Sequence, residues 1–346
     1  MKKQALTLLL FPVFLFGQDN IKFSETIIVE DLEKHLNILA SDSLEGRESG
    51  KRGQKMAGEY IMNHFKNIGI PPYKRNTYYQ KFREESDRHV CKYNCENCDE
   101  DFITKIFKKK RVVKGENVLG YIEGKDLKDE IIILTAHYDH LGKHDTLLFN
   151  GADDNGSGTA AIMEIAQAFM MAKKEGKGPR RSVLVMAVSG EEKGLLGSKH
   201  YTDNPVYPLE KTVANLNIDM IGRVDHYHDT SGYVYLIGSD MLSQELHNIS
   251  ENINKKHIGL NLDYTFNAED DPNRYYYRSD HYNFAKNNIP VIFYFNGIHD
   301  DYHKVTDTVE KIDFKKTETI TRLVFLTAWE LANRDARIIV DKKTKK

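Results

Sequence analysis

Histidine and carboxylate side chains follow five apolar or glycine-rich stretches of this sequence. The residues at these points are His137, Asp139, Asp154, Glu191, Glu192, Asp219, Tyr302 and His303. Imidazole and carboxylate groups without a thiolate suit zinc, with cobalt or manganese as possible substitutes. A single acidic residue after a strand usually caps the next helix, but five such points in one sheet predict a shared metal site.

The charges of these residues favour two metal ions over one. Asp154, Glu192 and Asp219 as anionic ligands, with His137 and His303 as neutral ligands, leave one positive charge uncompensated beside two divalent ions. A bridging hydroxide would supply the missing negative charge. A second ion would also relieve the repulsion between three close carboxylates, which a single ion does less well.

The adjacent residues Glu191 and Glu192 suggest a division of roles. One can bind a metal while its neighbour moves a proton from an attacking water to a leaving amine. Bound metal ions lower the pKa of that water and polarise the substrate carbonyl. A glutamate pair is often just a solvated helix start, but this pair follows the apolar run SVLVMAVSG. The pattern therefore indicates metal-assisted hydrolysis.

The elements that position these side chains follow from the hydrophobic pattern. Short continuous apolar runs are typical of parallel strands buried on both faces, and they alternate here with stretches of helical period. Such alternation predicts an α/β fold, with a mixed, mostly parallel sheet between two helical layers and a site at the carboxyl ends of the strands. The expected strands are 116–124, 130–137, 182–189, 212–219, 234–238 and 289–296, and the expected helices are 29–40, 53–67, 159–175, 240–255 and 314–335.

The composition excludes some classes of protein. The chain has 346 residues, with 49 Lys plus Arg against 51 Asp plus Glu, so it lacks the basic surplus of a dedicated nucleic-acid binder. Hydrophobic residues make up 40% and charged residues 29%, which is typical of a water-soluble globular protein. We expect one catalytic domain over 18–340, with a variable insertion near 74–114 and a charged tail at 341–346.

The N-terminus has the layout of a secretory signal. Lys2 and Lys3 precede an apolar run that is too short to span a bilayer, so 1–17 is predicted to be cleaved. An uncleaved anchor is the alternative. We expect an exported protein, periplasmic or extracellular, with no membrane contact in its mature form. Three cysteines, Cys91, Cys95 and Cys98, suit one disulfide with a leftover thiol, or a small metal clip.

Several motifs, taken together, resemble the dinuclear zinc aminopeptidase family, whose relatives include glutamate carboxypeptidases and glutaminyl cyclases. They span about 30–335. The motifs are LASDSLEGRESG (39–50), ENVLGYIEG (116–124), AHYDHLG (136–142), NGADDNGSG (150–158), SGEEKGLLGS (189–198), NIDMIG (217–222), SDHYNFAKNNIPVIFY (279–294) and YHKVTDT (302–308). The distance from Tyr121 to His137 is too short for the protease-associated domain that many relatives carry.

The resemblance implies a role for each site residue. His137 and Asp219 would bind one zinc ion, Glu192 and His303 the other, and Asp154 would bridge the two. Asp139 would orient His137, Glu191 would be the general base, and Tyr302 would stabilise the tetrahedral oxyanion. The peptide bond between Asp154 and Asn155 would be cis.

The predicted function is an exported zinc aminopeptidase that cleaves N-terminal peptide bonds of peptides, using a metal-bridging water activated by a Glu base. A carboxypeptidase or dipeptidase is the alternative, with Arg223, Arg274 or Arg278 holding a substrate carboxylate. A single-zinc cyclase and an inactive binding module are less favoured because the complete ligand set is present.

The substrate pocket is less well defined by the sequence. Tyr275, Tyr276 and Tyr277 would either line an apolar pocket or pack in the core. The candidates for binding a substrate ammonium are Asp153, Asp270 and Asp301. The oligomeric state is not indicated.

Overall fold

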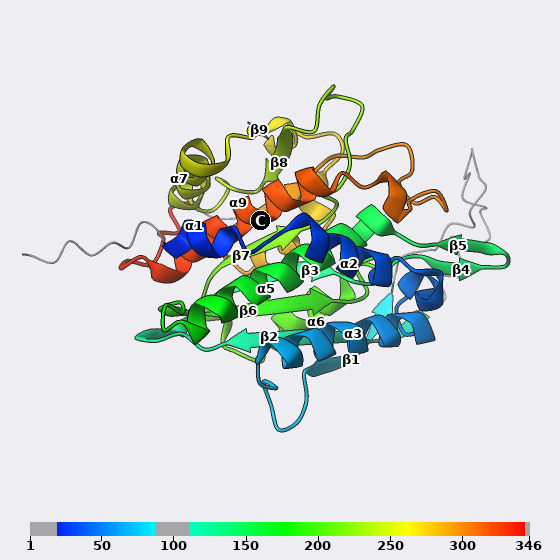
Figure 1. Cartoon of the computed structure of the whole chain (residues 1–346), viewed down its shortest axis with the longest axis horizontal. Helices are drawn as coiled ribbons and strands as arrows, with labels where there is room; N and C mark the ends of the chain where they lie inside the picture. The colour runs from blue at the N-terminus through cyan, green and yellow to red at the C-terminus, as the bar shows by residue number, and fades with distance from the viewer. Residues whose placement is uncertain (1–18, 87–110, 343–346) are drawn as a thin grey trace, which may run out of the picture.

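The computed structural model describes residues 19–86 and 111–342 (Figure 1). The expected signal segment, the three cysteines and the last four residues lie outside the described residues, so the expectations about them stay predictions. Within the described ranges, no helix combines the length and the apolar composition needed to cross a membrane.

A mixed sheet of eight strands forms the centre of the molecule, in the order β1-β2-β6-β3-β7-β10-β8-β9. The neighbours β6, β3, β7 and β10 are parallel, so their carboxyl ends meet at one edge. The pairs β1–β2, β2–β6 and β10–β8 are antiparallel. The strands are β1 Tyr79–Ser86, β2 Arg111–Ile122, β3 Leu127–His137, β6 Arg181–Val188, β7 Thr212–Ile218, β8 Tyr233–Ile237, β9 Asn261–Asp263 and β10 Val291–Phe295.

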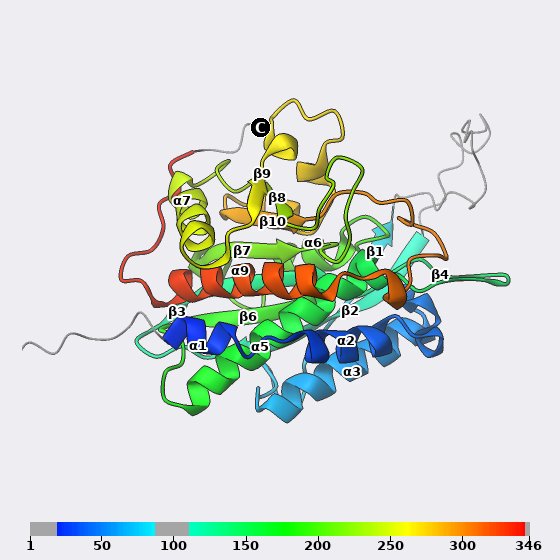
Figure 2. The ribbon, with the colours of Figure 1, turned by 45° about the horizontal axis from the view of Figure 1, so that its top comes forward.

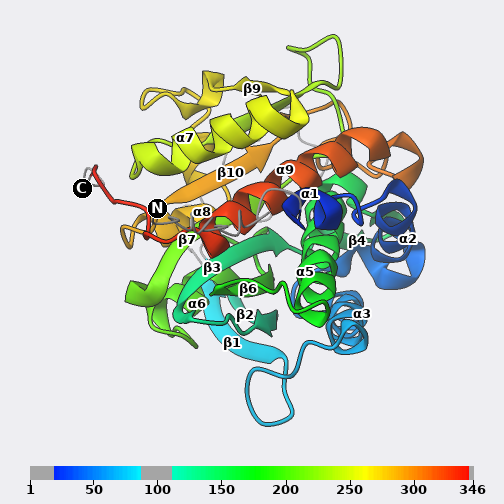
Figure 3. The same cartoon turned by 60° about the vertical axis from the view of Figure 1, so that its left-hand side comes forward.

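Helices cover both faces of the sheet, as Figures 2 and 3 show. One face carries α1 Asp19–Ser24, α2 Val29–Leu39, α3 Arg52–Ile68, α5 Gly158–Lys174, α7 Gln244–Ile253 and α9 Phe314–Asn333. The other carries α6 Leu196–Asp203 and α8 His281–Ala285. The predicted α/β fold is therefore confirmed. Gly69 ends α3 with a φ of 95°, a left-handed conformation that glycine adopts without steric cost.

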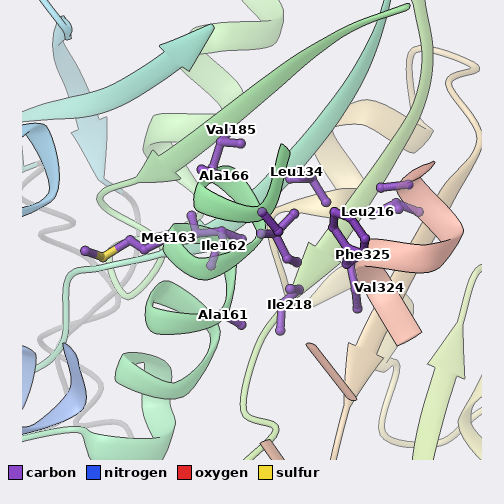
Figure 4. Packing of buried hydrophobic residues seen from close by; sticks show 14 of the residues in the cluster. Leu134, Ala161, Ile162, Met163, Ala166, Val185, Leu216, Ile218, Val324 and Phe325 are labelled. Carbon is purple, nitrogen blue, oxygen red and sulfur yellow. The ribbon is translucent and has the colours of Figure 1, made fainter. Parts of the chain in front are cut away.

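Alternating side chains of the central strands enter two separate hydrophobic cores. In β3, Ile132 and Leu134 join the core under α5 and α9, whereas Ile131 and Ile133 face the opposite core. Figure 4 shows Leu134 packing with residues of α5 and α9. Both faces of these strands are buried, which explains why the sequence reads as continuous apolar runs.

The described ends of the 74–114 segment include two paired strands. β1 pairs with β2 over its full length, from Tyr79 opposite Val118 to Ser86 opposite Arg111. It lies at the edge of the sheet, and Phe82 is buried while charged neighbours are exposed. A small hairpin of β4 Gly142–His144 and β5 Leu147–Phe149 was also not predicted.

The aromatic packing between α5 and α9 gives a stability prediction. Phe169 is fully buried, and its ring centroid lies 5.0 Å from that of Phe325 and 5.8 Å from that of Trp329. We expect Phe169→Ala to lower the free energy of unfolding by about 3–5 kcal/mol because it leaves a cavity. Urea unfolding followed by circular dichroism and by the fluorescence of Trp329, the chain's one tryptophan, would measure this loss.

Met171 provides the control for this measurement on the same helix. It is 38% exposed, so Met171→Ala should change the unfolding free energy by no more than about 0.5 kcal/mol. Equal effects of the two substitutions would contradict the assignment of Phe169 to the core.

Candidate metal centre

The carboxyl ends of the four adjacent parallel strands bring the candidate residues together. His137 is the last residue of β3, and Asp219 directly follows β7. Glu191 and Glu192 lie in the loop after β6, and His303 lies in the loop after β10. Residues far apart in the sequence thus meet at one edge of the sheet, as the pattern of strands predicted.

Asp154 lies at the middle of the cluster. Its Oδ1 is 3.4 Å from Nε2 of His137, and its Oδ2 is 3.1 Å from Nε2 of His303. Two imidazoles from different strand ends therefore approach the two oxygens of one carboxylate. The Asp154–Asn155 peptide bond is cis, as the resemblance implied.

His137, Asp154 and Asp219 form the first donor set, with one ligand atom of each within 4.8 Å of the others. His137 Nε2 is 3.2 Å from Asp219 Oδ1, and the hydroxyl of Ser279 donates to Asp219 Oδ2 at 2.7 Å. His137 Nδ1 donates to the backbone oxygen of Asp139 at 3.1 Å. These bonds direct Nε2 of the imidazole towards the carboxylates.

A second donor set contains a residue that the sequence analysis missed. His140, Asp154 and Glu192 meet the same distance criterion, with His140 Nδ1 3.0 Å from Glu192 Oε1. His303 Nε2 lies 3.5 Å from Glu192 Oε2, so both imidazoles face this carboxylate. His140 stands in the AHYDHLG motif, where its position three residues after His137 was the available signal.

Asp139 holds more than the imidazole of His137. Its Oδ1 is 3.8 Å from His137 Nδ1 and accepts a hydrogen bond from the backbone N–H of Glu191 at 3.3 Å. Its other oxygen accepts a hydrogen bond from the hydroxyl of Ser49. The carboxylate thus links the loops after β3 and β6. Its expected orienting role towards His137 stays a prediction.

Arg47 ties the N-terminal segment to the loops of the site. It is 1% exposed, and its guanidinium donates to the backbone oxygens of Tyr138 at 2.8 Å, Asn150 at 2.6 Å and Gly151 at 2.8 Å. Gly151 has a φ of 57°, and a Cβ there would lie 2.5 Å from the His140 ring. The loop before Asp154 therefore requires glycine at this position.

Asp307 supports the bridging carboxylate from the other side. It accepts hydrogen bonds of 3.1 Å from the backbone N–H groups of Asp153 and Asp154. The side chain of Asp153 accepts from the backbone of Gly222 at 2.7 Å and lies 3.2 Å from His299 Nε2. The expected role of Asp153 in binding a substrate ammonium is not supported, because it is committed to this buried network.

A pocket opens beside the first donor set. It is lined by His137, Asp154, Glu191, Asp219, Met220, Tyr275, Arg278, Ser279, Phe293, Phe295, Ile298 and Tyr302. The lining thus combines acidic side chains with apolar and aromatic ones. Tyr302 stacks on the ring of His303 with centroids 3.9 Å apart.

The structure places the other residues that were predicted to bind substrate at different sites. Tyr275 lines this pocket, whereas Tyr276, Tyr277 and Arg274 line a different cavity. Asp301 pairs with Arg223 at 2.6 Å and with Lys311 at 2.6 Å. Asp270 is exposed. Of the three arginines considered for a substrate carboxylate, Arg278 is the one that reaches the pocket.

The electrostatics of the cluster fit bound cations. Burial lowers the pKa of His303, but the Glu192 and Asp154 carboxylates outweigh it and raise that pKa to about 11. In the same way the pKa of His137 rises well above its usual value, mainly because of Asp219 acting against burial. The carboxylates thus attract positive charge, and imidazole–carboxylate donors of this kind suit zinc. The two donor sets that share Asp154 indicate metal binding.

Together, the sheet and the cluster at its carboxyl edge define an α/β protein with a candidate metal centre. Residues 117–328 match peptidase family M28. The chain belongs to peptidase family M28.

Curated relatives match parts of the chain. It is 38% identical over 109 residues to a probable glutamate carboxypeptidase LAMP1 of Arabidopsis thaliana, covering 31% of this chain and 15% of the relative. It is 30% identical over 222 residues to a probable leucine aminopeptidase of Trichophyton verrucosum, covering 62% of this chain and 57% of the relative. The matches therefore span less than two thirds of these relatives.

Solved structures share the fold over nearly the whole chain. The LapA aminopeptidase of Legionella pneumophila has a TM-score of 0.68 at 20% identity, covering 97% of this chain and 80% of LapA. The zinc aminopeptidase BSAP of Bacillus subtilis has a TM-score of 0.67 at 17% identity, covering 91% and 98%. A glutaminyl cyclase of Porphyromonas gingivalis has a TM-score of 0.62 at 17% identity, covering 88% and 98%.

Proposed function

We propose that the protein is an exported aminopeptidase that binds two zinc ions. The observation that carries this proposal is a single pocket lined by Glu191, by the first donor set and by apolar and aromatic side chains. Such a pocket would take an apolar N-terminal side chain while the adjacent carbonyl carbon lies at the cluster. His137 and Asp219 would hold one ion, Glu192 and His303 the other, and Asp154 both.

The two ions, when bound, would polarise the scissile carbonyl and lower the pKa of the water that bridges them. Glu191 would accept a proton from the attacking water and pass it to the leaving amine. Its backbone is fixed by the hydrogen bond to Asp139, which supports a defined position for this base. Burial raises the pKa of Tyr302 well above its usual value, so its hydroxyl keeps the proton that a hydrogen bond to the oxyanion needs.

Arg278 favours a second candidate function. Its guanidinium lies 5.0 Å from the ring centroid of Tyr275 and lines the pocket. No ion pair of Arg278 with an acidic residue occurs among the described residues, whereas Arg223 is paired with Asp301. A free guanidinium in the pocket would suit a substrate carboxylate, as in a carboxypeptidase or dipeptidase.

Blocking one peptide end at a time distinguishes the two functions. We expect acetylation of the N-terminus to lower kcat/KM by at least about a hundredfold, because a site that recognises the ammonium rejects its uncharged analogue. Amidation of the C-terminus should leave kcat/KM nearly unchanged. The measurement is hydrolysis of one tripeptide in its free, N-acetylated and C-amidated forms.

Arg278→Ala provides the control for the alternative. If Arg278 binds a substrate carboxylate, this variant should raise KM for the free acid but not for the amide. Strong sensitivity to amidation, lost in Arg278→Ala, would reject the aminopeptidase and support the carboxypeptidase or dipeptidase.

A further inference from the structure

A second cluster of metal-ligand residues lies in the helical layer, outside the candidate metal centre. His35 belongs to α2, His64 to α3 and Glu164 to α5, and α5 packs against both other helices on one face of the sheet (Figure 3). One ligand atom of each residue lies within 4.8 Å of the other two. None of the three has a part in the peptidase mechanism.

The hydrogen bonds of the two imidazoles place Nε2 of His35 beside the Glu164 carboxylate and leave Nδ1 of His64 without a proton. His35 Nδ1 is 2.6 Å from the Tyr60 hydroxyl, and its Nε2 is 2.9 Å from Glu164 Oε1. His64 Nε2 is 3.2 Å from the backbone oxygen of Met163. A carbonyl oxygen only accepts, so Nε2 of the neutral His64 ring carries the proton and Nδ1 carries none. Hydroxyl and carbonyl partners of this kind orient the histidines of metal sites.

Glu164 is buried without a paired Lys or Arg in the described part of the chain, although Lys34 is near enough to lower its pKa in part. Glu164 is 1% exposed and His35 is 5% exposed, and no Lys or Arg in the described part of the chain forms an ion pair with Glu164. Burial raises the pKa of Glu164 to about 8 and lowers the pKa values of His35 and His64 to about 4. Both imidazoles are therefore uncharged at neutral pH, and a divalent cation would stabilise the carboxylate.

We propose that His35, His64 and Glu164 bind a zinc ion. Two imidazoles and one carboxylate form a known zinc ligand set that leaves the fourth position to water. Magnesium and calcium prefer oxygen ligands and fit this set poorly. His64 is partly exposed, which gives water and the ion access to the cluster.

This ion would have a structural role. It would connect α2, α3 and α5, which at this point are otherwise held by packing and by the hydrogen bonds of His35 and His64. Metal binding stabilises a fold when the unfolded chain offers no such site. Because α5 begins at Gly158, soon after Asp154, the connection would also support the loop of the candidate metal centre.

The experiment counts zinc in the full chain with the catalytic ligands removed. Asp154→Ala serves as the background, and the chelator-stripped protein is reloaded with zinc, dialysed and measured by mass spectrometry. We expect Asp154→Ala/His64→Ala and Asp154→Ala/Glu164→Gln to hold one zinc ion per chain fewer than Asp154→Ala alone. Zinc should raise the Tm of the background by about 2–5 °C, and His64→Ala should abolish this rise.

Two further variants make the result decisive. His257→Ala, at a partly exposed histidine after α7, should leave the zinc count unchanged. Tyr60→Phe removes a hydroxyl but no ligand, and should weaken zinc binding about 10–100-fold. Equal zinc counts with and without His64 would overturn the proposal. If His64→Ala does not fold, unchanged zinc affinity in Asp154→Ala/Tyr60→Phe would overturn it instead.

Discussion

Replacing Glu191 by Gln is expected to lower kcat by at least about a hundredfold without loss of bound zinc. The amide keeps the size of the side chain but cannot accept the proton of the attacking water. Glu191 lines the pocket beside Asp154 and Asp219, and its backbone is fixed by Asp139. Steady-state kinetics of the purified variant, together with its zinc content, would test this assignment.

Glu45 offers the matched control for this substitution. Its side chain is 41% exposed and pairs with Arg52 at 2.6 Å, outside the pocket. Glu45→Gln should therefore leave kcat unchanged. If Glu191→Gln turned over substrate at nearly the wild-type rate, another group would have to be the base.

The second large effect is expected from Asp154→Ala, which should remove zinc from both positions of the candidate metal centre. The carboxylate contacts His137 through one oxygen and His303 through the other, and it belongs to both donor sets. Its loss therefore weakens two sites at once, and peptidase activity should fall below detection. Zinc analysis after dialysis would measure the loss directly.

Asp300→Ala is the control for this variant. Asp300 follows the same strand as His303, but its side chain is 85% exposed and it lies outside both donor sets. It should retain the zinc and the activity of the wild type. Full occupancy of both positions in Asp154→Ala would show that Asp154 does not bridge them.

The sequence indicated most of the site because the strands that carry it are buried on both faces. Such strands form continuous apolar runs, so the residues at their ends, such as His137 and Asp219, could be placed at one edge of the sheet. β1 was missed because it is an edge strand, whose exposed charges conceal the alternation around Phe82.

Contacts between loops that are distant in the sequence could not be predicted from the hydrophobic pattern. The sequence does not distinguish His140 from a histidine at the protein surface. Its contact with Glu192 becomes visible in the folded chain. The different positions of the two arginines likewise depend on tertiary contacts. Arg223 forms an ion pair with Asp301, whereas Arg278 lines the pocket. Residue type and spacing alone do not distinguish them.

The position of Arg47 indicates how much of the chain is needed to build the candidate metal centre. The family match starts at residue 117, yet the buried Arg47 belongs to the segment before it. Its guanidinium donates to the backbone oxygens of Tyr138, next to His137, and of Gly151, shortly before Asp154. Ser49 reaches Asp139 from the same segment. A shortened protein that started at the family boundary would keep the proposed ligands of the candidate metal centre but lose Arg47 and Ser49, whose hydrogen bonds connect its loops.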